Sequence, residues 1–259
     1  MPSPHSPQRL VQLAVLLLVA LPRLATAAEV RAAVAANFAA PLAELAELFH
    51  KQTGHTVVTT PGSTGKLATQ IRQGAPFDVF LAADEAAPAA LEAEGLAVKG
   101  SRFVYAVGRL VLWSPDAALL DAQATALREG RFAKLAIADP KLAPYGLAAQ
   151  EALTKLGLWS AVEPKLVRGE SVQQAYQFAA TGNAQLAFVS RAQVTVRGAL
   201  RGGSSWTVPS ALHAPIRQAA VLLTSARDRA AANAFLQFLR APKTLDLLRQ
   251  TGYEPPTGK

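Results

Sequence analysis

The sequence contains no cysteine, and this absence excludes several kinds of structure and chemistry. A chain without cysteine has no disulfide framework, no cysteine nucleophile and no thiolate metal site. Charged residues are also scarce, at 17% of the chain, whereas 51% of its 259 residues are hydrophobic. This composition excludes a disordered or coiled-coil protein, and the length suffices for one large domain or for two lobes with proper cores.

Aromatic residues are few, and the chain has no continuous block of positive charge. The formal net charge is +8, but the lysines and arginines are scattered along the sequence. A basic protein of this kind suits anionic solutes as well as nucleic acid or an acidic membrane. Because clustered cations and interleaved aromatics are both missing, we expect no nucleic-acid partner.

Motifs for catalysis are missing as well. The sequence has neither a G-x-S-x-G elbow nor an H-E-x-x-H motif. Its histidines lie away from any candidate nucleophile at the end of a strand; they are His5, His50, His55 and His213. We therefore expect a protein that is not an enzyme, and an exported enzyme remains the alternative from a different functional class.

One glycine-rich stretch, residues 62–67, needs a separate test, because a strand, a Gly-Lys pair and a helix together suggest a nucleotide P-loop. That motif requires G-x-x-x-x-G-K followed by Ser or Thr. Here Thr60 stands where the first glycine is required, and Leu67 replaces the metal-binding hydroxyl. The P-loop is therefore excluded.

The N-terminus has the pattern of a secretory signal peptide. Arg9 precedes an apolar run over residues 10–21, and Ala25-Thr26-Ala27 matches an A-x-A cleavage site. The run is too short for an ordinary membrane span of about 20 residues. We interpret residues 1–27 as a signal peptide and expect a periplasmic mature protein that starts near Ala28.

Strands and helices alternate along the rest of the chain. Apolar strands at 29–36, 55–58 and 78–84 are each followed by a helical pattern. This alternation predicts an α/β protein with mostly parallel sheets flanked by helices, in which ligands bind at the carboxyl ends of the strands. Two further β-like runs, at 103–113 and 216–224, predict two crossings between lobes.

The two crossings predict a hinge rather than a flexible linker. We expect a first lobe at 28–108, a second lobe at 109–214, and a return segment at 215–259 that completes the first lobe with two helices. This arrangement predicts a two-lobed α/β fold.

Several residues at the ends of strands or the starts of helices can donate hydrogen bonds into one cleft. The first turn of a helix has backbone N–H groups without intrahelical partners, and it lies at the positive end of the helix dipole. A fully ionised oxyanion accepts hydrogen bonds only, so it suits a site made only of donors. Taken singly, each position also fits an ordinary cap or turn. The candidates are Asn37, Ser63, Thr64, Tyr145, Val172 and Ser190.

The mature sequence resembles the periplasmic molybdate-binding proteins of ABC transporters. The resemblance covers residues 30–256, and its motifs are specific only as an ordered set. They are Ala35-Ala36-Asn37-Phe38, Gly62-Ser63-Thr64-Gly65-Lys66-Leu67, Gly74-Ala75-Pro76-Phe77-Asp78-Val79-Phe80, Asp139-Pro140, Ala143-Pro144-Tyr145-Gly146, Gly169-Glu170-Ser171-Val172 and Gly252-Tyr253-Glu254-Pro255.

The resemblance implies a two-lobed periplasmic-binding-protein fold of type II that closes on molybdate or tungstate and delivers it to a membrane permease. It implies contacts to the oxyanion from Asn37, Thr64, Tyr145 and Val172, with Ser63 beside them and no residue ligating the metal directly. Ser190 stands where some members have a tyrosine, so we expect Tyr145 to supply the aromatic hydroxyl here. We expect a monomer without a cofactor.

Other anions remain open as alternatives. Sulfate, phosphate or an organic acid would use the same fold, and cavity size would separate molybdate from sulfate. A phosphate site usually includes an acceptor for a ligand proton, and Glu170 is the nearest candidate, although we interpret it as a solvated residue beside the Ser171 cap. Iron is disfavoured because no pair of tyrosines converges with carboxylates on these loops.

Overall fold

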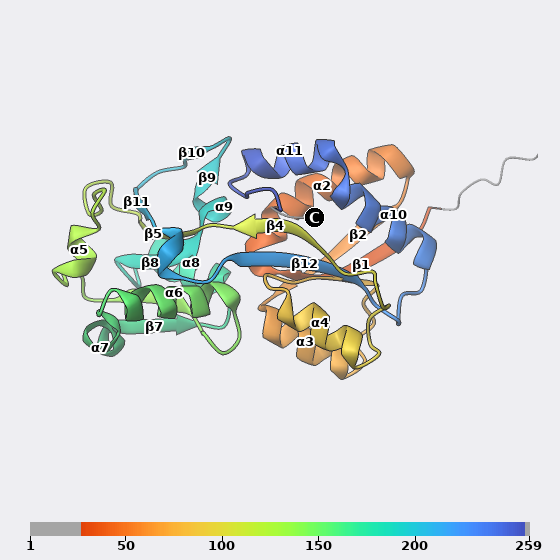
Figure 1. Cartoon of the computed structure of the whole chain (residues 1–259). Coiled ribbons are helices and arrows are strands. Elements are labelled where there is room, and N and C mark those ends of the chain that lie inside the picture. The colour runs from red at the N-terminus through yellow and green to blue at the C-terminus, as the bar shows by residue number, and fades with distance from the viewer. Residues whose placement is uncertain (1–26, 257–259) are drawn as a thin grey trace, which may run out of the picture.

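The computed structural model describes residues 27–256, which form two lobes lying side by side (Figure 1). Each lobe has a five-stranded sheet flanked by helices, so the prediction of a two-lobed α/β fold is confirmed. The predicted signal peptide lies outside the described residues, apart from its last position. Within residues 27–256 no helix is long and apolar enough to cross a membrane.

The sheet of the first lobe has the strand order β2-β1-β3-β12-β4. β1 pairs in parallel with β2 and β3, as the alternation of strands and helices predicts, whereas β12 is antiparallel to β3 and β4. The strands are β1 (Glu29–Ala35), β2 (Thr56–Gly62), β3 (Val79–Leu81), β4 (Phe103–Gly108) and β12 (Ile216–Leu222). The helices are η2 (Ala36–Phe38), α2 (Ala39–Thr53), α3 (Thr64–Arg72), α4 (Ala86–Ala93), α10 (Arg229–Arg240) and α11 (Pro242–Gln250).

Helical periodicity explains how α2 covers this sheet. Leu42, Leu45 and Phe49 recur at helical spacing and are all buried. The ring of Phe49 meets that of Phe235 on α10 edge-on, with centroids 5.3 Å apart. Burying each such side chain contributes roughly 1.5–3 kcal/mol of transfer free energy, so this face anchors α2. The N-terminal end of the helix is thereby held beside the end of β1.

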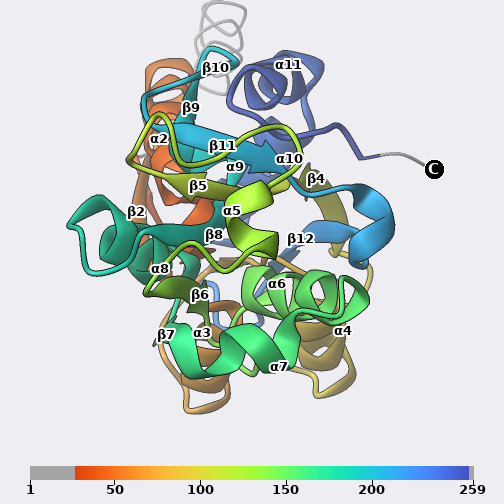
Figure 2. The same cartoon turned by 90° about the vertical axis from the view of Figure 1, so that its left-hand side faces the viewer.

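The sheet of the second lobe has the order β11-β5-β8-β6-β7, and Figure 2 shows these strands in that order from top to bottom. β6 is parallel to β7 and β8, and β5 is antiparallel to β8 and β11. The strands are β5 (Leu110–Ser114), β6 (Leu135–Ala138), β7 (Leu166–Gly169), β8 (Leu186–Ser190) and β11 (Ser204–Thr207), with a small hairpin of β9 (Thr195–Val196) and β10 (Ala199–Leu200). The helices are α5 (Thr125–Arg128), α6 (Pro144–Lys155), α7 (Trp159–Val162), η3 (Glu163–Lys165), α8 (Val172–Ala180), α9 (Arg191–Val194) and η4 (Ser210–Leu212).

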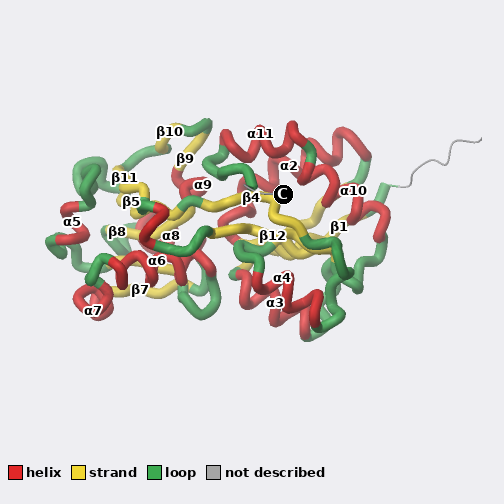
Figure 3. The backbone as a smooth tube through the Cα atoms, viewed as in Figure 1, coloured by secondary structure: helices red, strands yellow, loops and turns green. Residues whose placement is uncertain are grey.

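The chain changes lobes at two places. The β-like run predicted at 103–113 is two strands, β4 in the first sheet and β5 in the second, separated at Arg109. The chain returns after η4 through β12, which pairs with β4 (Figure 3). Two paired strands therefore lead between the lobes, and we keep 28–108, 109–214 and 215–259 as proposed limits.

Two local features at the candidate positions differ from an ordinary helix cap. Asn37 lies inside the short turn η2, and its side chain makes no cap bond. Helix α6 begins at Pro144, immediately before Tyr145. Proline suits the first helical position, because its fixed φ fits the helix and no N–H is needed there.

Candidate functional site

The starts of three long helices and of the η2 turn meet at a small cavity between the lobes. α3 belongs to the first lobe, and α6 and α8 belong to the second. The free volume of the cavity is about 10 Å³. This is close to what one water molecule requires and far below the roughly 300 Å³ of a pocket for an organic ligand. The lining residues are Ala35, Ala36, Asn37, Gly62, Ser63, Thr64, Ala83, Ala143, Pro144, Tyr145, Ser171 and Val172.

The first lobe brings two hydroxyl groups to this cavity. Ser63 has the extended backbone of an N-cap residue, but its side chain does not cap α3. Its Oγ is buried and makes no hydrogen bond within residues 27–256. Thr64 Oγ1 accepts a hydrogen bond from the Ala83 N–H at 3.0 Å, so its own proton remains for another acceptor. Both hydroxyls can donate to a ligand.

Asn37 lines the cavity, but its side-chain amide is already engaged. Nδ2 donates to Gln218 Oε1 and to the Tyr253 hydroxyl, each at 2.9 Å. An amide nitrogen has two protons, so none is left for a ligand. The part of Asn37 that can serve an anion is its backbone N–H.

Tyr145 is the aromatic group of the cavity. Its hydroxyl accepts a hydrogen bond from Gln218 Nε2 at 3.2 Å, so a residue of the first lobe holds it across the interface. Burial raises the pKa of Tyr145 far above its usual value, although hydrogen bonding with Ser190 and Gln218 acts in the opposite direction. The phenol therefore keeps its proton. Gly108 on β4 makes room for it, because a Cβ there would overlap the hydroxyl.

Ser190 lies behind Tyr145 and is not among the residues that line the cavity. Its backbone N–H donates to Gln193 Oε1 at 3.0 Å. Its buried Oγ makes no hydrogen bond of ordinary geometry within the described part of the chain. The structure thus places five of the six candidates on the cavity wall and the sixth beside the phenol.

The second lobe contributes the first turn of α8. The predicted Ser171 cap is present: Ser171 Oγ accepts from the Gln174 N–H, at a long 3.4 Å. The Gln174 side chain, however, accepts from the Glu170 N–H at 2.7 Å and not from Ser171. Among residues 27–256, neither the Ser171 N–H nor the Val172 N–H finds an acceptor. Two backbone donors are therefore free where α8 meets the cavity.

Contacts beside the cavity join the two lobes. The Gly65 N–H donates to Leu142 O at 2.9 Å, and a side chain at Gly65 would press on the backbone of Leu142. Lys66 Nζ lies 2.7 Å from Glu170 Oε2, with about half of each side chain exposed. Glu170 is therefore a solvated residue, as the sequence predicts, and it also pairs with a lysine of the opposite lobe. It does not line the cavity.

The cavity wall carries no charged side chain, and Tyr145 is its single titratable group. In the described chain no cluster of histidine and acidic residues could hold a metal ion. Helix starts and neutral hydroxyls thus supply the positive potential. This arrangement can hold a small anion through hydrogen bonds alone.

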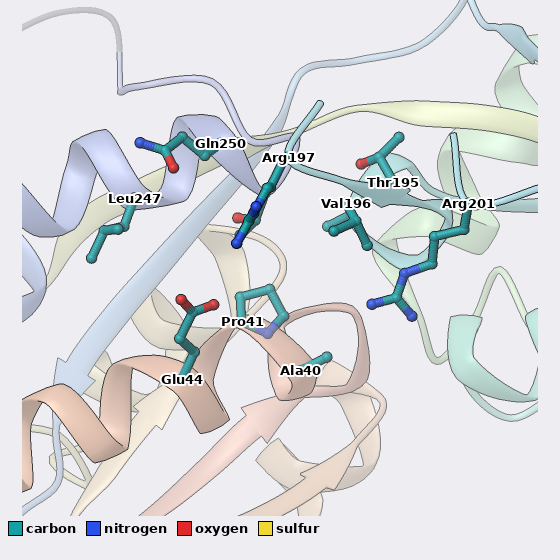
Figure 4. Close-up of a pocket in the computed structure, with 11 residues that line it drawn as sticks. Ala40, Pro41, Glu44, Thr195, Val196, Arg197, Arg201, Leu247 and Gln250 are labelled. Carbon is teal, nitrogen blue, oxygen red and sulfur yellow. The ribbon is translucent and has the colours of Figure 1, made fainter. Parts of the chain in front are cut away.

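A second, wider groove between the lobes differs in character (Figure 4). Arg197 and Arg201 of the second lobe enter it opposite Glu44 of α2, and Leu247 and Gln250 come from α11. This groove exposes two arginines and one carboxylate, whereas the small cavity collects unpaired donors from the helix starts of both lobes. The small neutral cavity is therefore the stronger candidate.

Some residues around the cavity were not predicted, namely Gln218, Tyr105 and Gly108. Gln218 is fully buried, and its Oε1 also accepts from the Tyr105 hydroxyl at 3.0 Å. One signal was present in the sequence: Gln218 is a lone uncharged polar residue in the strand Ile216–Leu222, which otherwise carries Arg217 and apolar residues. A buried polar side chain at such a position requires partners.

Comparison with known proteins places the chain among binding proteins. Residues 30–254 match the family described as bacterial extracellular solute-binding protein. A molybdate-binding protein of Azotobacter vinelandii is 53% identical over 88% of this chain and 91% of its own length. One of Rhodobacter capsulatus is 52% identical over 93% of each chain. The solved structure of an Azotobacter vinelandii periplasmic molybdate-binding protein superposes with a TM-score of 0.86 at 40% identity, covering 88% of this chain and all of the other.

Proposed function

The chain belongs to the family of bacterial extracellular solute-binding proteins, and we propose that it captures molybdate between its two lobes. Membership of this family makes it a component of transport rather than an enzyme. The names of its relatives support molybdate as the ligand. We extend the proposal to tungstate, because both are tetrahedral oxyanions that present only acceptors.

The observation that carries this proposal is the neutral, donor-only wall of the cavity. The proposed contacts are the hydroxyls of Ser63, Thr64 and Tyr145 and the backbone N–H groups of Asn37 and Val172. Each hydrogen bond to a charged acceptor is worth roughly 1.5–3 kcal/mol, so several of them offset the cost of removing water from a dianion. Ser190 supports the set indirectly, from beside Tyr145.

The same wall argues against protonated anions. Phosphate near neutral pH keeps at least one proton, and the wall has no carboxylate to accept it, only hydroxyls that also serve as donors. Glu170, the acceptor considered from the sequence, is paired with Lys66 outside the cavity. A dianion that carries no proton therefore fits this cavity better than phosphate does.

We further propose that residues 1–27 direct export to the periplasm and that the mature protein acts as a monomer. The captured anion would be handed to the membrane permease of an ABC transporter. Closure of the lobes around the anion would mark the loaded form, because ligand contacts from both sides favour the closed state.

Calorimetric titration of the mature chain with molybdate, tungstate, sulfate and phosphate tests the proposal at matched ionic strength. We expect tight binding of molybdate and tungstate, weak binding of sulfate and the weakest binding of phosphate. Equal affinity for sulfate and molybdate would leave a general oxyanion binder. A preference for an organic acid would overturn the assignment.

A further inference from the structure

We propose that Gln218 is a positioning residue, which fixes the direction of the Tyr145 hydroxyl so that this group donates its proton to the bound anion. The inference rests on the proposed function. It adds a reason why the cavity discriminates against protonated ligands, and it assigns that property to a residue outside the cavity wall.

The orientation of the Asn37 side chain follows from its own backbone carbonyl, which can only accept hydrogen bonds. The Tyr253 hydroxyl lies 2.8 Å from Asn37 O, so its single proton must point there. The same hydroxyl lies 2.9 Å from the Asn37 side-chain amide and must accept in that contact. The group of Asn37 that faces Tyr253 is therefore its NH₂ end. One main-chain oxygen thus sets the orientation of this side chain.

The orientation of the Asn37 amide then determines the orientation of the Gln218 amide. The second proton of Asn37 Nδ2 faces Gln218 at 2.9 Å, and it requires the oxygen end of that amide. The Tyr105 hydroxyl lies 3.0 Å from the same oxygen and 3.2 Å from Ala82 O, so both of its neighbours are acceptors that share its one proton. Gln218 must therefore turn its Nε2 toward Tyr145, where it donates at 3.2 Å.

The last step is the proton of Tyr145. A hydroxyl that accepts from Gln218 has to place its own proton elsewhere. Two acceptors are then within reach, the neighbouring Ser190 Oγ and an anion in the cavity. A hydrogen bond to a charged acceptor is roughly twice as strong as one to a neutral hydroxyl, so in the loaded protein the Tyr145 hydroxyl donates to the ligand.

The backbone supports this arrangement. The pairing of β12 with β4 shifts register between Gln218 and Ala219, where Gln218 faces Ala106 and Ala219 faces Val104. Tyr105 is therefore the extra residue of a bulge, and bulges commonly redirect side chains beside functional sites. The irregularity brings Tyr105 and Gln218 together at full burial.

The test is a double-mutant cycle of Gln218→Glu and Tyr145→Phe, with molybdate and phosphate as ligands. A carboxylate at position 218 accepts from Tyr145 and turns its proton away from the cavity. We expect Gln218→Glu to weaken molybdate binding by about 10–100-fold, the worth of one hydrogen bond to a charged group. Phosphate should lose less, because the turned hydroxyl can accept a ligand proton.

The double-mutant cycle distinguishes a change in the direction of the Tyr145 proton from repulsion between the new carboxylate at position 218 and the anion. Repulsion persists without the phenol, so the loss caused by Gln218→Glu should shrink at least about fivefold in the Tyr145→Phe background. An equal loss in both backgrounds, or an unchanged ratio of molybdate to phosphate affinity, would overturn the inference. A wild-type chain that binds no oxyanion would instead overturn the proposed function.

A second variant covers the case in which Gln218→Glu does not fold. Tyr253→Phe leaves the cavity wall intact but removes the hydroxyl that orients Asn37. The amides are then free to flip, and we expect a several-fold loss of molybdate affinity that disappears in the Tyr145→Phe background. The same loss in both backgrounds would contradict the account.

Discussion

The two lobes offer hydrogen-bond donors to one cavity by different means. In the first lobe the free donors at the cavity are two side-chain hydroxyls, those of Ser63 and Thr64, and one backbone N–H, that of Asn37. In the second lobe backbone donors predominate: the N–H groups of Ser171 and Val172 are free beside the single Tyr145 hydroxyl. A hydroxyl is lost by one ordinary substitution, whereas a backbone donor is removed only by proline. The lobes should therefore respond to mutation in different ways.

A network of side chains in the first lobe orients a donor of the second lobe. The network of Asn37, Gln218, Tyr105 and Tyr253 belongs to the first lobe, and it holds Tyr145 of the second. The ion pair of Lys66 with Glu170 joins the lobes beside the cavity and is exposed, while the polar network is buried. Buried, fully paired groups specify geometry, and an exposed ion pair adds little free energy.

Replacement of Val172 should reduce the affinity for molybdate the most, and it tests the role of backbone donors in the second lobe directly. Val172→Pro removes the N–H at a first helical position, where proline fits, and Ser171 already has the extended backbone that precedes proline. We expect about a 10–100-fold loss of molybdate affinity. Val172→Ala keeps the donor and is the matched control. Equal losses in two folded variants, checked by melting, would show that Val172 acts through packing.

Ser63→Ala tests a side-chain donor of the first lobe. The buried Ser63 Oγ has no partner within residues 27–256, so its removal relieves a desolvation cost in the ligand-free protein. We expect about tenfold weaker binding together with equal or higher stability to urea. Destabilisation without a change in affinity would mean that the hydroxyl supports the fold and not the ligand.

The ion pair between the lobes should matter least to affinity. Lys66→Met removes a contact in which both side chains are about half exposed. Such pairs contribute about 0–1 kcal/mol, so we expect at most about a fivefold loss at low salt and none at high salt. A larger loss that persists in high salt would assign Lys66 to the ligand itself.

Alkaline pH should leave the affinity for molybdate unchanged but lower the free energy of unfolding. Burial raises the pKa of Tyr105, Tyr145 and Tyr253 above the usual value of about 10. In the unfolded chain these groups lose protons first, so the unfolded state binds fewer protons and the free energy of unfolding falls. The stabilisation is complete below about pH 10 and is lost as the pH rises toward the raised values. Urea titrations and calorimetry check this, and binding that weakens near pH 8 would contradict it.

Much of this arrangement followed from local sequence patterns. Strand and helix alternation predicted the two lobes, and the positions of Asn37, Ser63, Thr64, Tyr145 and Val172 at element ends predicted the cavity wall. These features depend on neighbouring residues only. The cap pattern of Ser171 was predicted for the same reason, although its glutamine bonds one residue further back.

Features that depend on contacts between distant residues could not be predicted. Asn37 and Gln218 are 181 positions apart, so no local pattern shows that one side chain consumes the protons of the other. Ser190 is absent from the wall but lies beside Tyr145, a neighbour 45 positions away in the sequence. The pairing of Glu170 with Lys66 requires that the lobes face each other.

The central claim is that one anion lies between the lobes and takes donors from both. An amide-resolved NMR titration of the mature chain with molybdate tests it directly. We predict that the Thr64 and Val172 amide resonances shift together and reach their end points at one equivalent of molybdate. Shifts confined to the amides of one lobe, with binding confirmed by calorimetry, would contradict the account.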